Sequence, residues 1–225
     1  MPARQINCWF IFTRVWWALV IALSAYTAAY VLTLLLSWSW LSSTYRYAAP
    51  LFANSIVASN IALLVHILSA LPCLVIGPLL FIQAIRLRYL NVHRWLGRCY
   101  VFTVFISAPV GFSLAAVNQF GWISRAGFMT LATVWFVTTF IGYRRIRATD
   151  IIGHRRWMIR SYAISIAVIS VRFLDVPDGI SRETWYPIMT WVCWVPNALI
   201  AEAYLKITDH NGKIALPRRY RPSSN

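Results

Sequence analysis

Four uncharged, apolar stretches of the sequence are each long enough to cross a lipid bilayer. They lie at residues 15–36, within 47–85, at 99–116 and at 126–143. A helix needs about 20 apolar residues to span the hydrocarbon core. Two further stretches, 157–175 and 185–205, are apolar except for charges near their ends. The sequence therefore predicts an all-α membrane protein whose six transmembrane helices lie at about 15–36, 60–85, 99–117, 126–143, 157–175 and 185–205.

The composition agrees with this fold class and excludes a water-soluble one. Hydrophobic residues make up 60% of the chain and charged residues only 12%, whereas soluble domains have about 45–50% and 25%. Six crossings with short connections use nearly the whole length. We therefore expect a single integral membrane domain over 1–225, in which spans two to five form a four-helix core and residues 206–225 form a cytoplasmic tail.

The net charge of +15 is distributed unevenly between the two sides of this predicted topology. Of the 21 Lys and Arg residues, 17 fall on the side of the termini and of the second and fourth connections. The remaining four are Arg46, Arg125, Arg172 and Arg182. Cytoplasmic connections carry an excess of Lys and Arg. The sequence thus predicts a bacterial inner-membrane protein with both termini in the cytoplasm.

The basic charge is therefore explained by topology, and no nucleic-acid partner is expected because the sequence has no soluble module with stacking aromatics. Glycine-rich phosphate loops, nucleophile elbows and His-Glu metal motifs are also missing from the sequence. These absences argue against hydrolase or transferase chemistry.

The two most basic connections contain the same motif. His93-Arg94-Trp95-Leu96-Gly97-Arg98-Cys99-Tyr100 and His154-Arg155-Arg156-Trp157-Met158-Ile159-Arg160-Ser161-Tyr162 share W-x-x-R-x-Y behind a His-Arg pair. Each copy opens a span, which predicts that spans two and three are related to spans four and five by a parallel duplication. The alternative is that Trp, Tyr and Arg recur at both sites because they favour a membrane interface.

On these motifs, the sequence resembles the family of predicted bacterial multi-pass membrane proteins known as domain of unknown function 2306. The resemblance covers about residues 60–205. It rests on His66, on both His-Arg motifs with Arg172 beyond the second, and on Trp194-Val195-Pro196-Asn197 with Glu202. The family implies no established activity. The layout is also distantly similar to the two-haem transmembrane cytochromes b of the ascorbate-linked type.

That distant resemblance implies a haem held by histidines on alternate helices of a four-helix core. His93 and His154 are expected at one depth, and neutral imidazoles there would serve as axial ligands of haem b. The haem propionates would bind arginines among Arg94, Arg98, Arg155, Arg156 and Arg160. The fourth span has no histidine, so an outer haem is not expected. The other interpretation is that His93 and His154 cap their own helices.

Other polar residues inside the spans need partners. Glu202 is expected to pair with Arg98 or Arg160. His66 is expected to pair with Arg172 or Asp175, or to form a hydrogen bond within the bundle. Asn197, which follows Pro196, marks a kink or a polar pocket.

The sequence thus favours a haem b electron carrier with a quinone or another redox partner. Two alternatives are open: a protein that binds or transports an anionic lipid or small molecule, and a structural subunit of a membrane complex or homo-oligomer.

Overall fold

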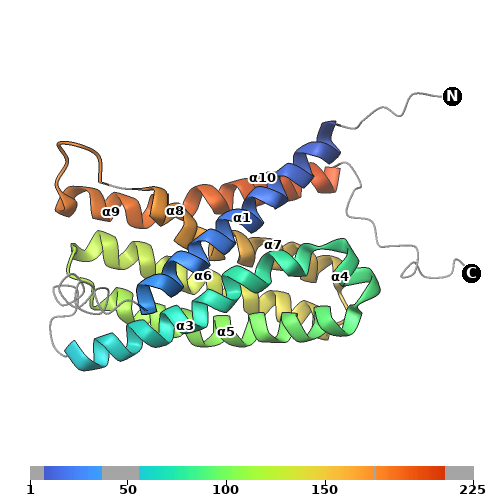
Figure 1. Ribbon diagram of the computed structural model, residues 1–225, viewed down its shortest axis with the longest axis horizontal. Coiled ribbons are helices and arrows are strands. Elements are labelled where there is room, and N and C mark those ends of the chain that lie inside the picture. The colour runs from blue at the N-terminus through green and yellow to red at the C-terminus, as the bar shows by residue number, and fades with distance from the viewer. Residues whose placement is uncertain (1–7, 37–55, 175, 211–225) are drawn as a thin grey trace, which may run out of the picture.

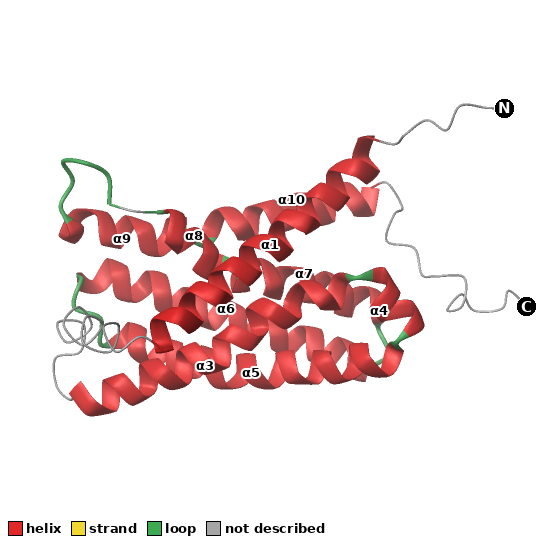
Figure 2. Ribbon diagram, in the orientation of Figure 1, coloured by secondary structure: helices red, strands yellow, loops and turns green. Residues whose placement is uncertain are grey.

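The computed structural model describes residues 8–36, 56–174 and 176–210, and every regular element in these ranges is a helix (Figures 1 and 2). The helices are α1 (Cys8–Leu36), α3 (Ile56–Phe81), α4 (Gln83–Arg88), α5 (Leu90–Ala116), α6 (Gly121–Arg147), α7 (Ile151–Ser165), α8 (Ala167–Phe173), α9 (Arg182–Val192) and α10 (Val195–His210).

Four of these helices form a closed ring. The neighbouring pairs around it are α3 with α5, α5 with α6, α6 with α7, and α7 with α3. Helices α5 and α7 therefore lie diagonally across the ring. Outside it, α1 packs on α3 and α8, α9 packs on α6, and α10 packs on α7 (Figure 1). Spans two to five, predicted as the core, coincide with the ring and its α8 extension.

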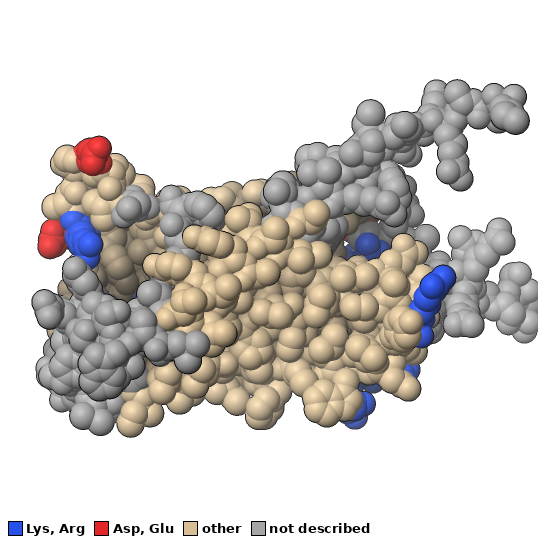
Figure 3. All heavy atoms as spheres, in the orientation of Figure 1, with Lys and Arg blue, Asp and Glu red and all other residues tan. Residues whose placement is uncertain are grey.

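The helix lengths and the distribution of charge are those of a membrane protein. Four segments of the described residues are long and apolar enough to cross a bilayer: Ile61–Phe81, Leu90–Ala116, Gly121–Arg147 and Arg182–Asp209. In α1, the apolar stretch Val20–Thr33 is shorter than these four segments. Charged side chains gather at the two ends of the molecule and leave an uncharged band between them (Figure 3).

The third helix of the prediction starts earlier than expected. Helix α5 begins at Leu90, not near residue 99, because Arg94 and Arg98 lie exposed on its first turns. Charges on an exposed helix face end an apolar run without ending the helix. The first His-Arg motif is therefore helical along its whole length.

The fifth predicted helix is broken at Ile166. It begins at Ile151 and continues as α8 after the break. The Ser165 hydroxyl donates to the carbonyl of Ser161 at 3.1 Å, and back-bonding of this kind bends helices. The sixth predicted helix is likewise divided, into α9 and α10, at Cys193 and Trp194.

A buried hydrogen-bond network joins α5, α6 and α7 at the centre of the ring. The Tyr100 hydroxyl lies 2.9 Å from Ser161 Oγ and 2.8 Å from Ser165 Oγ. Trp135 Nε1 donates to Ser165 Oγ at 2.8 Å, and Thr139 Oγ1 lies 2.7 Å from Ser161 Oγ. Because buried polar groups are costly without partners, this network fixes the register of the three helices.

Candidate functional site

The two copies of the His-Arg motif meet at one end of the ring. We call this the basic end, and define it by the α4–α5 and α6–α7 connections and the first turns of α5 and α7. His93 and His154 are each the fourth residue of their helix, α5 and α7. They approach closely enough for the charge of His154 to act on His93. The ring thus brings together two histidines from diagonal helices.

The first turn of α7 is shaped to hold His154. Asp150 caps the helix, since its Oδ1 accepts from the Gly153 amide at 2.8 Å. A Cβ at Gly153 would collide with this carboxylate, so the cap requires glycine there. His154 Nδ1 lies 2.9 Å from the carbonyl oxygen of Gly142 in α6.

That hydrogen bond decides which nitrogen of His154 is available to a ligand. A carbonyl oxygen only accepts, so Nδ1 carries the proton and Nε2 keeps its lone pair. Burial lowers the pKa of His154 from its ordinary value of 6.5, against smaller opposing effects of Gly142 and Asp150. The imidazole is therefore neutral at pH 7, which is the form that binds metals.

His93 is the second histidine that could supply a ligand nitrogen at the basic end. Its ring is partly buried, and its Nδ1 is fully buried with no hydrogen-bond partner among the residues that the structure describes. A buried polar atom without a partner is rare in native proteins.

Arg86 in α4 is a site residue that the sequence did not single out. Burial lowers its pKa below the ordinary value, and the nearby charge of Arg155 adds to this effect. The charge of Arg86 also acts on His93. No carboxylate pairs with Arg86 among the residues that the structure describes. The only sequence signal was its place as the first charge after a long apolar run.

The arginines expected to bind propionates fall into three groups. Arg94 and Arg98 are exposed. Arg155 is partly buried and near Arg86. Two are paired with carboxylates of α10. Arg156 Nη2 lies 2.8 Å from Asp209 Oδ1, and Arg156 Nε is buried without a partner in the described part of the chain. Arg160 holds Glu202 with two bonds, of 2.5 and 2.9 Å.

The Arg160–Glu202 pair confirms one of the two partners expected for Glu202. The Arg160 guanidinium also lies 4.7 Å from the ring centroid of Trp157. It is therefore committed to the contact between α7 and α10, which leaves Arg86 and Arg155 as half-buried cations of the basic end that pair with no carboxylate among the described residues.

The basic end contains residue types that could hold a haem, but no cluster that could hold a bare metal ion is found in its described part. The described residues contain no group of three or more His, Cys, Asp or Glu that could hold a metal ion. A haem needs only two axial nitrogens, plus cations for its propionates. His93, His154, Arg86 and Arg155 are residues of those kinds.

His66 forms a hydrogen bond within the helix bundle, which was one of its expected contacts. Its Nδ1 lies 2.9 Å from the carbonyl oxygen of Ser107 and 3.0 Å from Ser107 Oγ, both in α5. The expected pairing with Arg172 or Asp175 falls outside what the structure describes, since Asp175 and the Arg172 side chain are not among the described parts.

Asn197 lies beside the break between α9 and α10. Its Nδ2 donates to the Cys193 carbonyl at 3.0 Å and to Ser170 Oγ at 3.1 Å. Pro196 is the second residue of α10, where its missing N–H is tolerated. The expected kink therefore lies just before Pro196, and Asn197 ties it to α8.

Comparison with known proteins gives the family but not an activity. No curated protein and no solved structure is significantly similar to this chain. One family model, described as a predicted membrane protein of domain of unknown function 2306, matches residues 63–205. The match runs from α3 into α10 and includes both His-Arg motifs, His66 and Glu202. The chain therefore belongs to the domain of unknown function 2306 family of predicted membrane proteins.

Proposed function

We propose that this protein is a haem b electron carrier of the bacterial inner membrane, with His93 and His154 as the axial ligands. It crosses the bilayer six times, with α1, the four-membered ring and the α9–α10 pair, and the basic end faces the cytoplasm. Lipid surrounds it, and a quinone or another redox molecule exchanges electrons with it.

One observation carries the proposal. Histidines from the two copies of one motif lie on diagonal helices at the same end of the ring, within electrostatic reach of each other. His154 Nε2 keeps its lone pair because Nδ1 bonds to Gly142. A carbonyl partner of this kind is what orients a metal-binding histidine.

A bound haem would supply one-electron transfer, and the residues of the chain would hold and tune it. Gly142 and the Asp150 cap fix the His154 ring. Arg86 and Arg155 would bind the propionates as charge-assisted hydrogen bonds. Their positive charge would also favour the reduced form, since it stabilises the added electron.

The test is a reduced-minus-oxidised absorption spectrum of protein expressed with ample haem. We expect the wild type to show a b-type spectrum, and His93→Ala and His154→Ala each to abolish it. His66→Ala is the matched control, because it removes a partly buried histidine whose Nδ1 is also bonded to a carbonyl. A colourless wild type, or loss of the spectrum only in His66→Ala, would overturn the proposal.

A second function, binding of a free anion, is favoured by Arg86. This half-buried cation has another cation, Arg155, as its neighbour and no carboxylate partner among the described residues. A phosphate or carboxylate between the two would relieve their repulsion.

Haem-free protein separates this function from the first. Binding of inorganic phosphate, and of vesicles with or without phosphatidylglycerol, would be compared for the wild type and Arg86→Gln. Arg88→Gln is the control, because Arg88 is an exposed residue of the same short helix. Binding that is weakened by Arg86→Gln but not by Arg88→Gln would support the anion site, and equal binding by all three proteins would exclude it.

A further inference from the structure

A partly open cavity of about 430 Å³ lies between the helix ring and the helices packed on it, away from the basic end. Its walls come from α1, α3, α5, α6, α7, α8 and α9 and consist mostly of Leu, Ala, Val and Ile side chains. None of the described lining residues is charged. A volume of this size falls in the range of small-molecule sites, about 300–1,000 Å³.

His66 places one fixed polar atom on this apolar wall. The Ser107 carbonyl accepts from Nδ1 at 2.9 Å, so Nδ1 carries the proton and Nε2 is left as an acceptor. No hydrogen bond of Nε2 is formed within the part of the chain that the structure describes. Gly111 lies close to the His66 imidazole, since a Cβ at Gly111 would be only 2.8 Å from His66 Cε1. The imidazole is thus held in one position.

Trp135, Ser165, Asn118 and Tyr186, which also line the cavity, already bond to other groups of the protein. Trp135 Nε1 donates to Ser165 Oγ, which also lies 2.8 Å from the Tyr100 hydroxyl. Asn118 accepts from the Phe120 amide at 2.8 Å and bonds to the Tyr186 side chain. The ligand that completes this cavity must therefore be apolar and must carry a hydrogen-bond donor for His66 Nε2.

The walls also favour a flat ligand. Phe128, Trp135 and Tyr186 all line the cavity, and aromatic side chains pack well on another ring. An acyl chain would fill the volume but offers no donor. A charged ligand would lose its hydration without gaining a counter-ion.

We propose that this cavity binds a lipid-soluble hydroxylated ring, a quinol or a phenol, whose hydroxyl donates to His66 Nε2. The site is independent of the haem at His93 and His154, because the cavity lining contains neither residue. A bilayer supplies compounds of this class from its apolar phase, which suits a site without charge.

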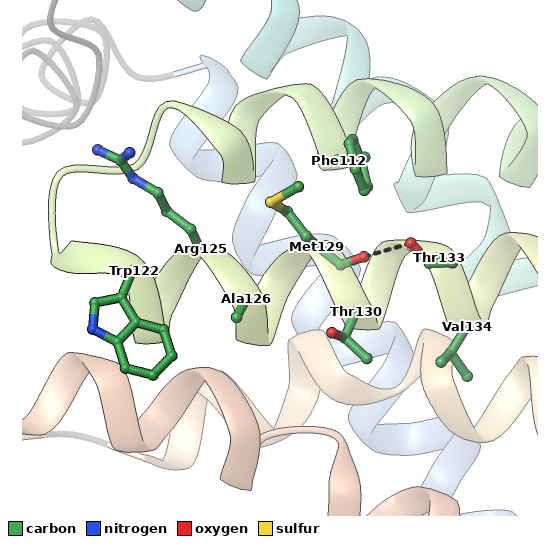
Figure 4. A pocket seen from close by; sticks show the side chains of 8 residues that line it. All are labelled: Phe112, Trp122, Arg125, Ala126, Met129, Thr130, Thr133 and Val134. Atoms are coloured by element: carbon green, nitrogen blue, oxygen red, sulfur yellow. Dashed lines mark hydrogen bonds between the residues drawn. The ribbon is translucent and has the colours of Figure 1, made fainter.

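The second hollow of the molecule has no comparable polar group. It measures about 480 Å³ and lies along α6 (Figure 4). Its one charged side chain, Arg125, turns toward the α5–α6 connection, where Nε donates to the Asn118 carbonyl at 2.7 Å. The Thr133 hydroxyl donates to the Met129 carbonyl at 2.8 Å. These bonds use Arg125 Nε and the Thr133 hydroxyl, and we assign no ligand to this hollow.

Haem-free protein in detergent, kept anaerobic, provides the test. The two probes are a decyl-chain benzoquinol and its dimethyl ether, which has the same ring and tail but no hydroxyl. Binding is followed by tryptophan fluorescence, to which Trp135 contributes. We expect the wild type to bind the quinol about tenfold more tightly than the ether, since one buried hydrogen bond is worth about 1–1.5 kcal/mol.

Variants assign the discrimination to one residue. His66→Ala should bind the quinol and the ether equally, whereas Arg88→Gln, a change at an exposed residue outside the cavity lining, should keep the wild-type ratio. The wild-type ratio alone remains decisive if His66→Ala fails to fold. Equal binding of the two probes by the wild type, no saturable binding of either, or an unchanged ratio in His66→Ala would overturn the proposal. None of these results bears on the haem spectrum.

Discussion

Arg160 and Glu202 form an ion pair with two hydrogen bonds, whereas a second pair nearby, of Arg156 and Asp209, has a single contact and a similar exposure. The side chains of Arg160 and Glu202 are 26% and 44% exposed, and those of Arg156 and Asp209 are 40% and 37% exposed. The first pair has two hydrogen bonds. Bidentate geometry and partial burial both raise the contribution of an ion pair.

We therefore predict that Glu202→Gln lowers the free energy of unfolding by about 1–2 kcal/mol, because it leaves Arg160 short of its partner. Asp209→Asn, which removes the single contact, should change it by no more than about 0.5 kcal/mol. Unfolding in mixed detergent measures both. Equal losses in the two variants would show that α10 is not held to α7 chiefly by Glu202.

His154 gives the haem-free protein a pH-dependent stability. Burial lowers its pKa below 6.5, so the unfolded chain binds the proton more tightly than the folded one. Stability is then greatest at neutral pH and falls as the pH drops below about 6.5. His154→Gln should make this fall shallower. Thermal unfolding between pH 5 and 7.5 is the measurement, and an identical slope in the variant would refute the burial of a neutral imidazole.

At the scale of single residues, the sequence predicted the motif histidines and the carboxylate partner but missed Arg86. His93 and His154 share a repeated pattern, and Glu202 is an acid in an apolar run, so each is visible without coordinates. Arg86 is not, because its burial depends on how α4 folds back against α5 and brings it near Arg155 of α7.

Close packing of α3 against α7 depends on one glycine. A Cβ at Gly77 would overlap the ring of Tyr162, and an aromatic ring inside a bundle cannot move aside as a flexible chain end does. Gly97 in α5 is a matched case without this constraint, since the nearest atom to its Cβ position is Leu80 Cδ2 at 4.0 Å.

We predict that Gly77→Ala destabilises the protein by about 1–3 kcal/mol through overpacking. Gly97→Ala should be neutral or stabilising by up to about 1 kcal/mol, because alanine favours the helix. Thermal unfolding of the two purified variants makes the comparison. A harmless Gly77→Ala would mean that α3 and α7 lie further apart than described.

Helix identity was predictable from the sequence, but helix ends and breaks were not. Apolar runs located every described core helix. The charges of Arg94 and Arg98 hid the first two turns of α5, since an exposed helix face tolerates them. No proline or glycine next to Ile166 indicates a helix break in the sequence. The break depends on Ser165, whose bonds to Tyr100 and Trp135 exist only in the folded ring.

On the scale of the whole molecule, all the arginines of the α4–α5 and α6–α7 connections lie at one end, and the start of α1 and the end of α10 lie there too (Figure 1). An odd number of membrane crossings would put the start of α1 and the end of α10 at opposite ends of the molecule. This arrangement agrees with the expected six crossings, whose orientation the positive-inside rule assigns.

Cysteine labelling in whole cells tests that orientation. Ser181 and Ala148 are exposed at opposite ends of the ring. We predict that Ser181→Cys reacts with a membrane-impermeant maleimide from outside, and that Ala148→Cys reacts only after the cells are opened. Native Cys73 and Cys193 are buried, and a variant lacking both Cys8 and the partly exposed Cys99 is the background. The reverse pattern would invert the topology.

The diagonal placement of α5 and α7 has a consequence for symmetry. A half-turn about the ring axis exchanges α3 with α6 and α5 with α7, and so carries one His-Arg motif onto the other. A flat molecule on this axis would therefore meet a histidine and arginines on each flank. The flanks nevertheless differ: His154 Nδ1 bonds to the Gly142 carbonyl, whereas His93 Nδ1 has no partner among the described residues. Tyr162 also lies 3.2 Å from Ser24 of α1, whereas Tyr100 bonds within the ring. A molecule whose two edges differ is therefore expected to favour one orientation over the other.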